Sequence, residues 1–155
     1  MEEVKTTPSP FPSIEVTVTP SEIPMSDEDI ITEAVNTEFE KENVISVNYD
    51  PTNRIVQIKA MGKDNLTSKM TVDGMYLSMS NIMEKLSDFK DVNISFEIVY
   101  PLVDEYGNAT DTTVITATFT STTRNKINWD YFLIENMPDV ADEWWMHPAL
   151  VSALQ

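Results

Sequence analysis

The segment from Leu66 to Leu86 constrains the fold most, because it is the longest stretch of the chain with a helical period. Its apolar residues recur at steps of three and four, which places them on one face of an α-helix. Asn65 is the predicted N-cap, since its side-chain oxygen can accept a bond from an amide of the first turn. We expect this helix to pack across a sheet. The residues of the apolar face are Leu66, Met70, Val72, Met75, Met79, Ile82, Met83 and Leu86.

Two features of this helix have alternative interpretations. Gly74 costs about 1 kcal/mol relative to alanine in a helix interior. It therefore indicates either the close approach of a strand or loop, or a break into two shorter helices. The methionines are typical of a core that fills irregular gaps. The alternative is a methionine-rich groove that binds a partner.

One hairpin is predicted on each side of this helix in the sequence. In residues 44–49, Ile45, Val47 and Tyr49 alternate with polar residues, and a proline-containing turn separates them from a second strand at residues 54–60. The other hairpin pairs a strand near residues 94–100, weakened at its end by Pro101, with one over residues 112–120. A loop over residues 104–110 joins them. The final strand carries apolar side chains on one face and, on the other, Val114, Thr116, Thr118 and Thr120, as expected for an exposed sheet surface.

Shorter elements are predicted at both ends of the chain. Ser26 begins a helix that runs to about Lys41, with acidic residues in its first turn. Residues 128–134 form a short strand or an extended run. Pro138 starts a short acidic helix through Glu143, which the residue before Pro148 brings to an end.

The order helix, hairpin, helix, hairpin, tail predicts an α+β fold built from two αββ units. The helices would pack on one face of a mostly antiparallel sheet of about four strands, followed by an aromatic-rich C-terminal segment. Residues 26–155 would form one domain. Residues 1–25, rich in Pro, Thr and Ser, would be a flexible tether, in which residues 14–18 form a strand only by pairing with another edge.

The chain carries a formal charge of −16, and its excess of acids lies at the two ends. Residues 1–43 hold eleven acids and two bases, residues 44–129 hold ten and eight, and residues 130–155 hold five acids and no base. Without clustered Lys and Arg, direct nucleic-acid binding is not expected. The acids indicate a solvated surface, or alternatively a DNA-like surface that occupies a basic site of a partner. No transmembrane segment or signal peptide is predicted.

The residue types that carry catalysis or hold metals form no recognisable set. Cysteine is absent, the chain has one histidine, and its three glycines form no phosphate-binding loop. Acid pairs occur without an accompanying base or nucleophile, and the oxygen-rich loop lacks EF-hand spacing. We therefore expect no enzyme, no catalytic residue, no metal and no cofactor. The groups weighed are Asp104 with Glu105, Asp142 with Glu143, Asp104 with Asn108 and Asp111, and His147.

Aromatic residues gather near the C-terminus and provide the candidate binding residues. One interpretation is that this segment folds back and seals one end of the core. The other is that Trp144 and Trp145 present their rings to a ligand, a glycan or a protein, since such rings dominate interface energies. The candidate binding residues are Trp129, Tyr131, Trp144, Trp145 and His147.

Four motifs together carry a resemblance to a known group of proteins. They are a Pro/Thr/Ser segment before an acidic helix, Val-Ile-Ser-Val-Asn-Tyr-Asp at 44–50, Tyr-Gly-Asn at 106–108, and Asp-Val-Ala-Asp at 139–142 followed by Trp-Met-His-Pro-Ala-Leu at 145–150. The chain resembles uncharacterised surface lipoproteins of Gram-positive bacteria, without the signal peptide and lipidated cysteine. The resemblance implies an extracellular, membrane-tethered domain and assigns no catalytic residue.

The sequence therefore predicts a non-enzymatic extracellular binding domain, monomeric and tethered at a cell surface. Its partner would be a protein or a cell-envelope ligand, and it would meet the membrane only through a lipid anchor outside this chain. The alternative is a cytoplasmic acidic inhibitor that occupies a basic, nucleic-acid-binding site of a partner.

Overall fold

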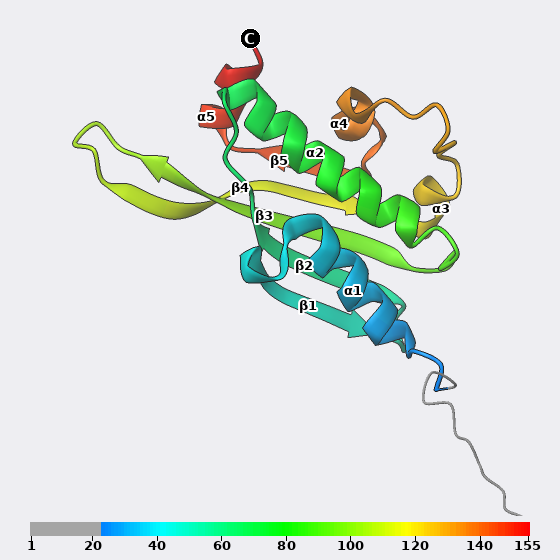
Figure 1. The fold of residues 1–155 in the computed structure, drawn as a ribbon. Coiled ribbons are helices and arrows are strands. Elements are labelled where there is room, and N and C mark those ends of the chain that lie inside the picture. Colours follow the sequence, from blue (N-terminus) through cyan, green and yellow to red (C-terminus); the bar gives the residue numbers. More distant parts are fainter. Residues whose placement is uncertain (1–22) are drawn as a thin grey trace, which may run out of the picture.

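A five-stranded mixed sheet with two long helices across one face forms the fold (Figure 1). The computed structural model describes residues 23–155. The strands are β1 (Val44–Asp50), β2 (Ile55–Met61), β3 (Asn93–Val103), β4 (Ala109–Phe119) and β5 (Glu143–Met146). The helices are α1 (Asp27–Phe39), α2 (Ser68–Lys85), α3 (Ser121–Arg124), α4 (Met137–Val140) and α5 (Pro148–Val151), with short 3-10 turns η2 (Lys41–Asn43), η3 (Ile134–Asn136) and η4 (Ser152–Leu154).

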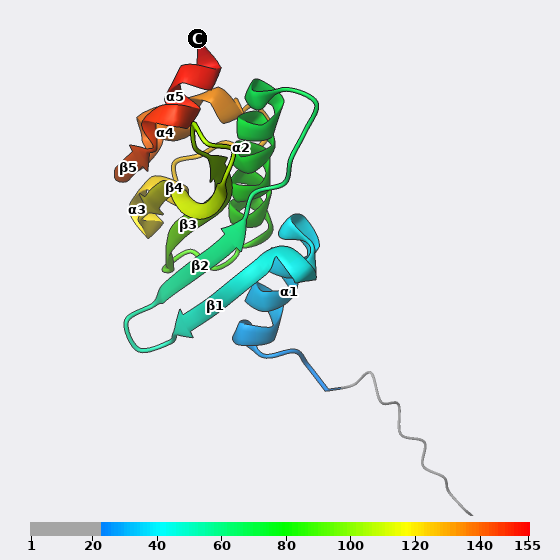
Figure 2. The ribbon, with the colours of Figure 1, turned by 90° about the vertical axis from the view of Figure 1, so that its left-hand side faces the viewer.

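The strands lie in the sheet in the same order as in the chain, from β1 to β5. Pairs β1–β2, β3–β4 and β4–β5 are antiparallel, whereas β2 and β3 are parallel. The parallel pair arises because α2 carries the chain back along the sheet before β3 begins (Figures 1 and 2). The α+β class is confirmed, and the two predicted αββ units are present in outline, but the sheet has five strands rather than about four.

The fifth strand corrects the prediction for the C-terminal segment. The helix begun near Pro138 ends at Val140, and residues 143–146 pair with β4 instead of continuing as helix. Aromatic residues favour strands, and β4 offers an open edge there. His147 does not end a helix but begins α5, since its Nδ1 accepts a bond from the Ala149 amide at 3.1 Å. Residues 128–134, predicted to be strand or extended, contain no strand.

Helix α2 confirms the predicted apolar face except in its first turn. Its N-cap is Thr67 rather than Asn65, because the Thr67 hydroxyl accepts the Met70 amide at 3.1 Å. Leu66 is therefore outside the helix and 91% exposed. Met75, Met79 and Met83 are buried and belong to the core, whereas Met70 in the first turn is 45% exposed.

Gly74 lies in unbroken helix, and a loop approaches it closely. A methyl group at Gly74 would lie 3.1 Å from Nδ2 of Asn65. The same Asn65 amide donates to the carbonyl of Met70 at 3.2 Å. The interpretation of Gly74 as a point of close approach is therefore correct, and the break into two helices is wrong.

Helix α1 begins as predicted and ends two residues early. Ser26 and Asp29 form a capping box in which the Ser26 hydroxyl accepts the Asp29 amide at 3.1 Å. Glu40 ends the helix by adopting a positive φ of 64°. Glu38 then joins the two long helices, because it accepts bonds from Lys85 at 2.8 Å and from Asn81 at 3.0 Å.

Two bulges move side chains away from their predicted faces. The register of β1 shifts at Ile45, which is consequently 50% exposed rather than facing the core with Val47. The register of β4 shifts at Val114, which is fully buried although alternation placed it with the exposed threonines. Strand β3 also continues past Pro101 to Val103, since β2 has ended there and no neighbour on that side needs the missing amide.

The hydrophobic core lies between the helices and the sheet. Phe96 and Phe119 meet edge to face with ring centroids 6.2 Å apart, and the buried faces of α1 and α2 cover them. The predicted tether at residues 1–25, including the strand considered at 14–18, lies almost wholly outside the described residues. Among residues 23–155, no helix is long and apolar enough to cross a membrane.

Candidate ligand-binding face of the sheet

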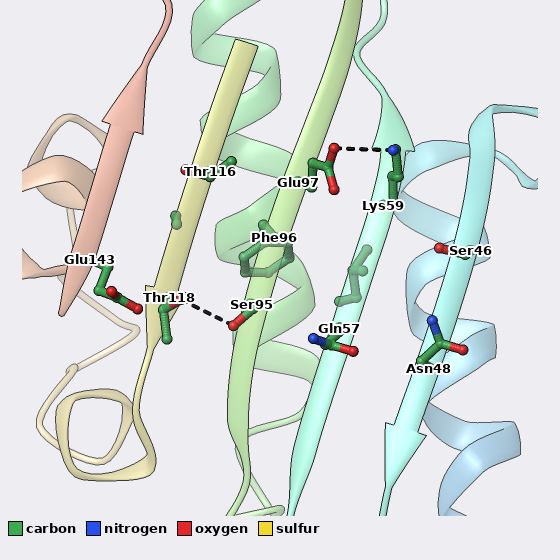
Figure 3. A pocket seen from close by; sticks show the side chains of 12 residues that line it. Ser46, Asn48, Gln57, Lys59, Ser95, Phe96, Glu97, Thr116, Thr118 and Glu143 are labelled. Carbon is green, nitrogen blue, oxygen red and sulfur yellow. Dashed lines mark hydrogen bonds and ion pairs between the residues drawn. The ribbon is translucent and has the colours of Figure 1, made fainter. Parts of the chain in front are cut away.

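The face of the sheet opposite α1 and α2 is polar and open to solvent (Figure 3). The strand registers place its side chains in two rows that cross all five strands. We call these ten residues the polar face. One row is Asn48, Gln57, Ser95, Thr118 and Glu143, and the other is Ser46, Lys59, Glu97, Thr116 and Trp145.

Small side chains in the middle strands leave a shallow hollow of about 450 Å³ over this face. Ser95 and Thr118 lie at its floor, with their hydroxyl oxygens 3.1 Å apart. Lys59 and Glu97 form an ion pair at 3.1 Å in the next row (Figure 3). Most residues that line the hollow carry hydroxyl, amide or charged groups, and the apolar lining residues are Ile58, Phe96 and Ala117.

Glu97 is held in its ionised form by its neighbours. The Thr113 hydroxyl donates to its Oε1 at 2.8 Å, and this bond, followed by the one from Lys59, lowers the pKa of Glu97 below its ordinary value of 4.5. A general acid requires the opposite shift, towards neutral pH. Glu97 is therefore suited to accept hydrogen bonds and not to donate a proton.

Other groups of the polar face keep their hydrogen-bonding capacity. Within residues 23–155, the side chains of Asn48, Gln57 and Thr116 make no hydrogen bond to the protein, and all three are exposed. Each amide can both donate and accept, and a hydroxyl can do the same. The arrangement can therefore bind an uncharged polar ligand through several hydrogen bonds at once.

Adjacent candidate residues Trp144 and Trp145 lie on opposite sides of the sheet. Trp145 is 44% exposed at the edge of the polar face, directly opposite Thr116. Its ring lies edge-on to the His147 imidazole, with centroids 6.0 Å apart. Trp144 is half-buried on the helix side and packs edge-on against Tyr76 of α2 at 5.4 Å.

Trp129 and Tyr131 are not brought to the polar face. Trp129 packs against Phe132 at 5.7 Å and against the core. Tyr131 is 81% exposed and borders a separate hollow of about 470 Å³ with Lys126 and Ile127. The five candidate residues therefore do not form one surface. Trp129 and Trp144 pack on the core, Trp145 and His147 lie together beside the polar face, and Tyr131 borders the second hollow.

The sequence signal for the polar face was the threonine face of β4, which supplies Thr116 and Thr118. Ser46, Asn48 and Gln57 stand at alternate positions of strands that were predicted correctly, yet no feature of the sequence marked them as binding residues. Their significance arises only because the register aligns them with Ser95 and Thr118 on neighbouring strands.

Two of the acidic residues considered for catalysis or metal binding, Asp104 and Asp142, have structural partners. Asp104 accepts the amides of Tyr106 at 2.8 Å and Asn108 at 2.9 Å, as a turn residue does. Asp142 accepts the Thr120 amide at 2.7 Å and the Thr123 hydroxyl at 2.9 Å. In the described part of the chain, no three His, Asp or Glu side chains are placed together to hold a metal ion.

No protein-family model, curated protein or solved structure matches this chain. The resemblance to surface lipoproteins of Gram-positive bacteria therefore stays a prediction. Since a fold alone does not specify a function, the inference must come from the chemistry of the site.

Proposed function

We propose that this protein is a non-enzymatic binding domain whose polar face is the recognition surface. The observation that supports this most is that the two faces of the sheet carry different kinds of side chain. The helix side is filled by buried apolar residues, whereas the polar face exposes hydrogen-bonding side chains across the full width of the sheet. Exposed polar residues aligned on rigid strands form a preorganised binding surface.

The ionisation of Glu97 supports a binding role over a catalytic one. Its lowered pKa and its bonds to Thr113 and Lys59 remove the acidic proton that hydrolysis of a polar polymer would need. The other carboxylate of the polar face, Glu143, lies two strands away, on the edge strand β5. The polar face therefore suits reversible binding.

A location at a cell surface is part of the proposal. It is supported by the resemblance to Gram-positive surface lipoproteins and by the proline-rich composition of residues 1–25. The domain would then meet components of the cell envelope, either its own or those of another cell.

The experiment uses the full chain, labelled with a fluorophore at its N-terminal amine, and isolated Gram-positive cell walls as the probe. Thr116→Arg places a long charged side chain in the hollow. Thr110→Arg is the matched control, since Thr110 is also an exposed threonine of β4 but lies outside the polar face. We expect saturable binding that Thr116→Arg weakens about tenfold or more and Thr110→Arg changes by less than about twofold.

Two results would overturn the proposal. One is wall binding no greater than that of an unrelated acidic protein. The other is equal binding by both arginine variants, which would place the recognition surface elsewhere on the molecule.

The acidic-inhibitor alternative has a surface of its own. Glu28, Asp29 and Glu33 are exposed on α1, and none forms an ion pair within residues 23–155. If this surface occupied a basic partner site, the affinity would fall steeply between low and high salt. Wall binding through the uncharged groups of the polar face would change little with salt.

A further inference from the structure

We infer that the ligand of the polar face is a neutral, hydroxyl-rich polysaccharide chain, with Trp145 as the aromatic platform at one end of the site. This inference rests on the proposed function, because it names the chemistry of the ligand that the same surface would bind. Four properties of the surface support it: its hydrogen-bonding groups, its exposed ring, its charge and its extent.

The hydrogen-bonding groups of the polar face match those of a sugar. A sugar hydroxyl both donates and accepts, so it is best bound by groups that do the same or by charged groups beside them. Asn48 and Gln57 provide amides, Thr116 a hydroxyl, and the Lys59–Glu97 pair a fixed donor and acceptor. Hydrogen bonds to charged groups are the stronger ones.

Trp145 supplies the apolar contact that hydroxyl groups cannot. One face of a sugar ring exposes mainly C–H groups, which pack well against the flat face of an indole. The ring is held in place before binding, since it meets the His147 imidazole at 83°, and that imidazole is itself fixed by the Ala149 amide. A contact surface fixed in advance loses less conformational entropy when the ligand binds.

The charge of the polar face argues against anionic ligands. Its single cation, Lys59, is neutralised by Glu97, and Glu143 adds an unpaired negative charge among the described residues. The whole chain carries −16. Nucleic acids, phosphate-rich polymers and other polyanions would be repelled, so a polysaccharide bound here is not a polyanion.

The composition of the surface argues against a protein partner, and its extent argues for a polysaccharide chain rather than a single sugar. Cores of protein interfaces are depleted in Ser, Lys and Glu and enriched in aromatic residues, whereas the centre of the polar face is Ser95, Lys59 and Glu97. Five strands at a spacing of about 4.8 Å give about 19 Å between the first and last strand. That distance favours an oligomer over a single sugar.

The test uses the full chain and soluble, neutral oligomers of glucose, of N-acetylglucosamine and of mannose, from two to six units long. Binding is followed by calorimetry and by tryptophan fluorescence, with inorganic polyphosphate as the anionic control. We expect at least one series to bind with an affinity that rises with length, while polyphosphate neither binds nor competes.

Variants at Trp145 then test whether its ring is the aromatic platform. Trp145→Ala should weaken the best oligomer about tenfold or more, and Trp145→Tyr should retain most of the affinity, because a flat ring remains. Tyr131→Ala is the matched control, since Tyr131 is a still more exposed aromatic residue outside the polar face. Equal losses in Trp145→Ala and Tyr131→Ala would overturn the assignment of Trp145.

Failure of this inference is distinguishable from failure of the proposed function. In one outcome, walls bind through the polar face, no neutral oligomer competes, and protease treatment of the walls abolishes binding. The ligand is then a protein, so the inference is wrong while the proposed function stands. Competition by polyphosphate would also overturn the inference. If neither the walls nor any neutral oligomer binds, both are wrong.

Discussion

Trp144 and Trp145 are neighbours in the chain, yet they lie on opposite faces of β5. Trp144 packs against Tyr76 of α2 with ring centroids 5.4 Å apart, and Trp145 faces solvent opposite Thr116 of β4. Successive side chains of a strand alternate between faces, so one ring belongs to the core and the other to the polar face. The interpretation that the segment packs on the core therefore holds for Trp144, whereas binding by Trp145 stays a prediction.

Replacing the two tryptophans should separate stability from binding. Trp144→Ala removes a half-buried ring from the core, and we expect the free energy of unfolding to fall by about 2 to 4 kcal/mol. Trp145→Ala removes an exposed ring and should cost less than about 1 kcal/mol. Urea unfolding of both variants measures this difference. A larger loss from Trp145→Ala would contradict the assignment of the rings to the two faces.

Arg124 should be one of the most sensitive positions in the fold. It is 4% exposed and its guanidinium donates to the carbonyls of Leu86, Phe89 and Val92 at 2.6–2.9 Å, which ties α3 to the end of α2. Arg124→Met removes all three bonds from a buried site, although the carbonyls of Leu86 and Phe89 still accept backbone amides, and should cost about 3 to 5 kcal/mol. Thermal unfolding measures this loss of stability, with Lys126→Met as an exposed control. Equal melting temperatures for the two variants would show that the bonds of Arg124 do not stabilise the fold.

The ion pair of the polar face predicts a pH-dependent effect at Glu97. Because the pKa of Glu97 is lower in the folded protein than its ordinary 4.5, its contribution to stability is complete above that value and is lost as pH falls through the lowered pKa. Glu97→Gln should therefore lower the free energy of unfolding at pH 7 by at most about 1 kcal/mol, since the pair is well exposed. Urea unfolding should show the difference at neutral pH.

At a pH below the lowered pKa of Glu97 the two proteins should approach equal stability, because wild-type Glu97 then loses its charge as well. Glu105→Gln, at an exposed turn, is the control and should match the wild type at both pH values. A Glu97→Gln effect of the same size at both pH values would show that it arises from packing and not from ionisation.

Gly74→Ala tests whether the loop beside α2 can yield. Alanine gains about 1 kcal/mol over glycine in a helix interior, but its methyl group would lie 3.1 Å from the Asn65 amide. Asn65 is on an exposed loop and needs to move only slightly. We expect net stabilisation of up to about 1 kcal/mol in urea unfolding; a loss of more than about 1 kcal/mol would mean that the loop is rigid.

Periodicity predicted the elements whose faces are purely polar or apolar. The burial of Val72, Met79 and Ile82 on α2 and the hairpin of β1 and β2 follow from it directly. It failed where one extra residue changes the alternation, at Ile45 and Val114, because a bulge depends on the partner strand and not on local sequence.

The candidate site was harder to predict, for a related reason. Glu143 and Trp145 belong to a strand of four residues that exists because β4 has an open edge, and the segment on its own matches an acidic helix. The polar face also unites side chains from five strands, and their alignment depends on the register of each pair. Of the polar face, the sequence named only Trp145 as a binding candidate, and Thr116 and Thr118 as exposed sheet residues.

The most direct test of the polar face as the recognition surface is an NMR titration. The full chain, labelled with nitrogen-15, is titrated with soluble fragments released by enzymatic digestion of Gram-positive walls. We expect chemical-shift changes confined to the amides of residues 46–48, 57–59, 95–97, 116–118 and 143–145 and to the Trp145 indole. Changes centred on α1 or on residues 126–140, or no changes at saturating fragment, would contradict the account.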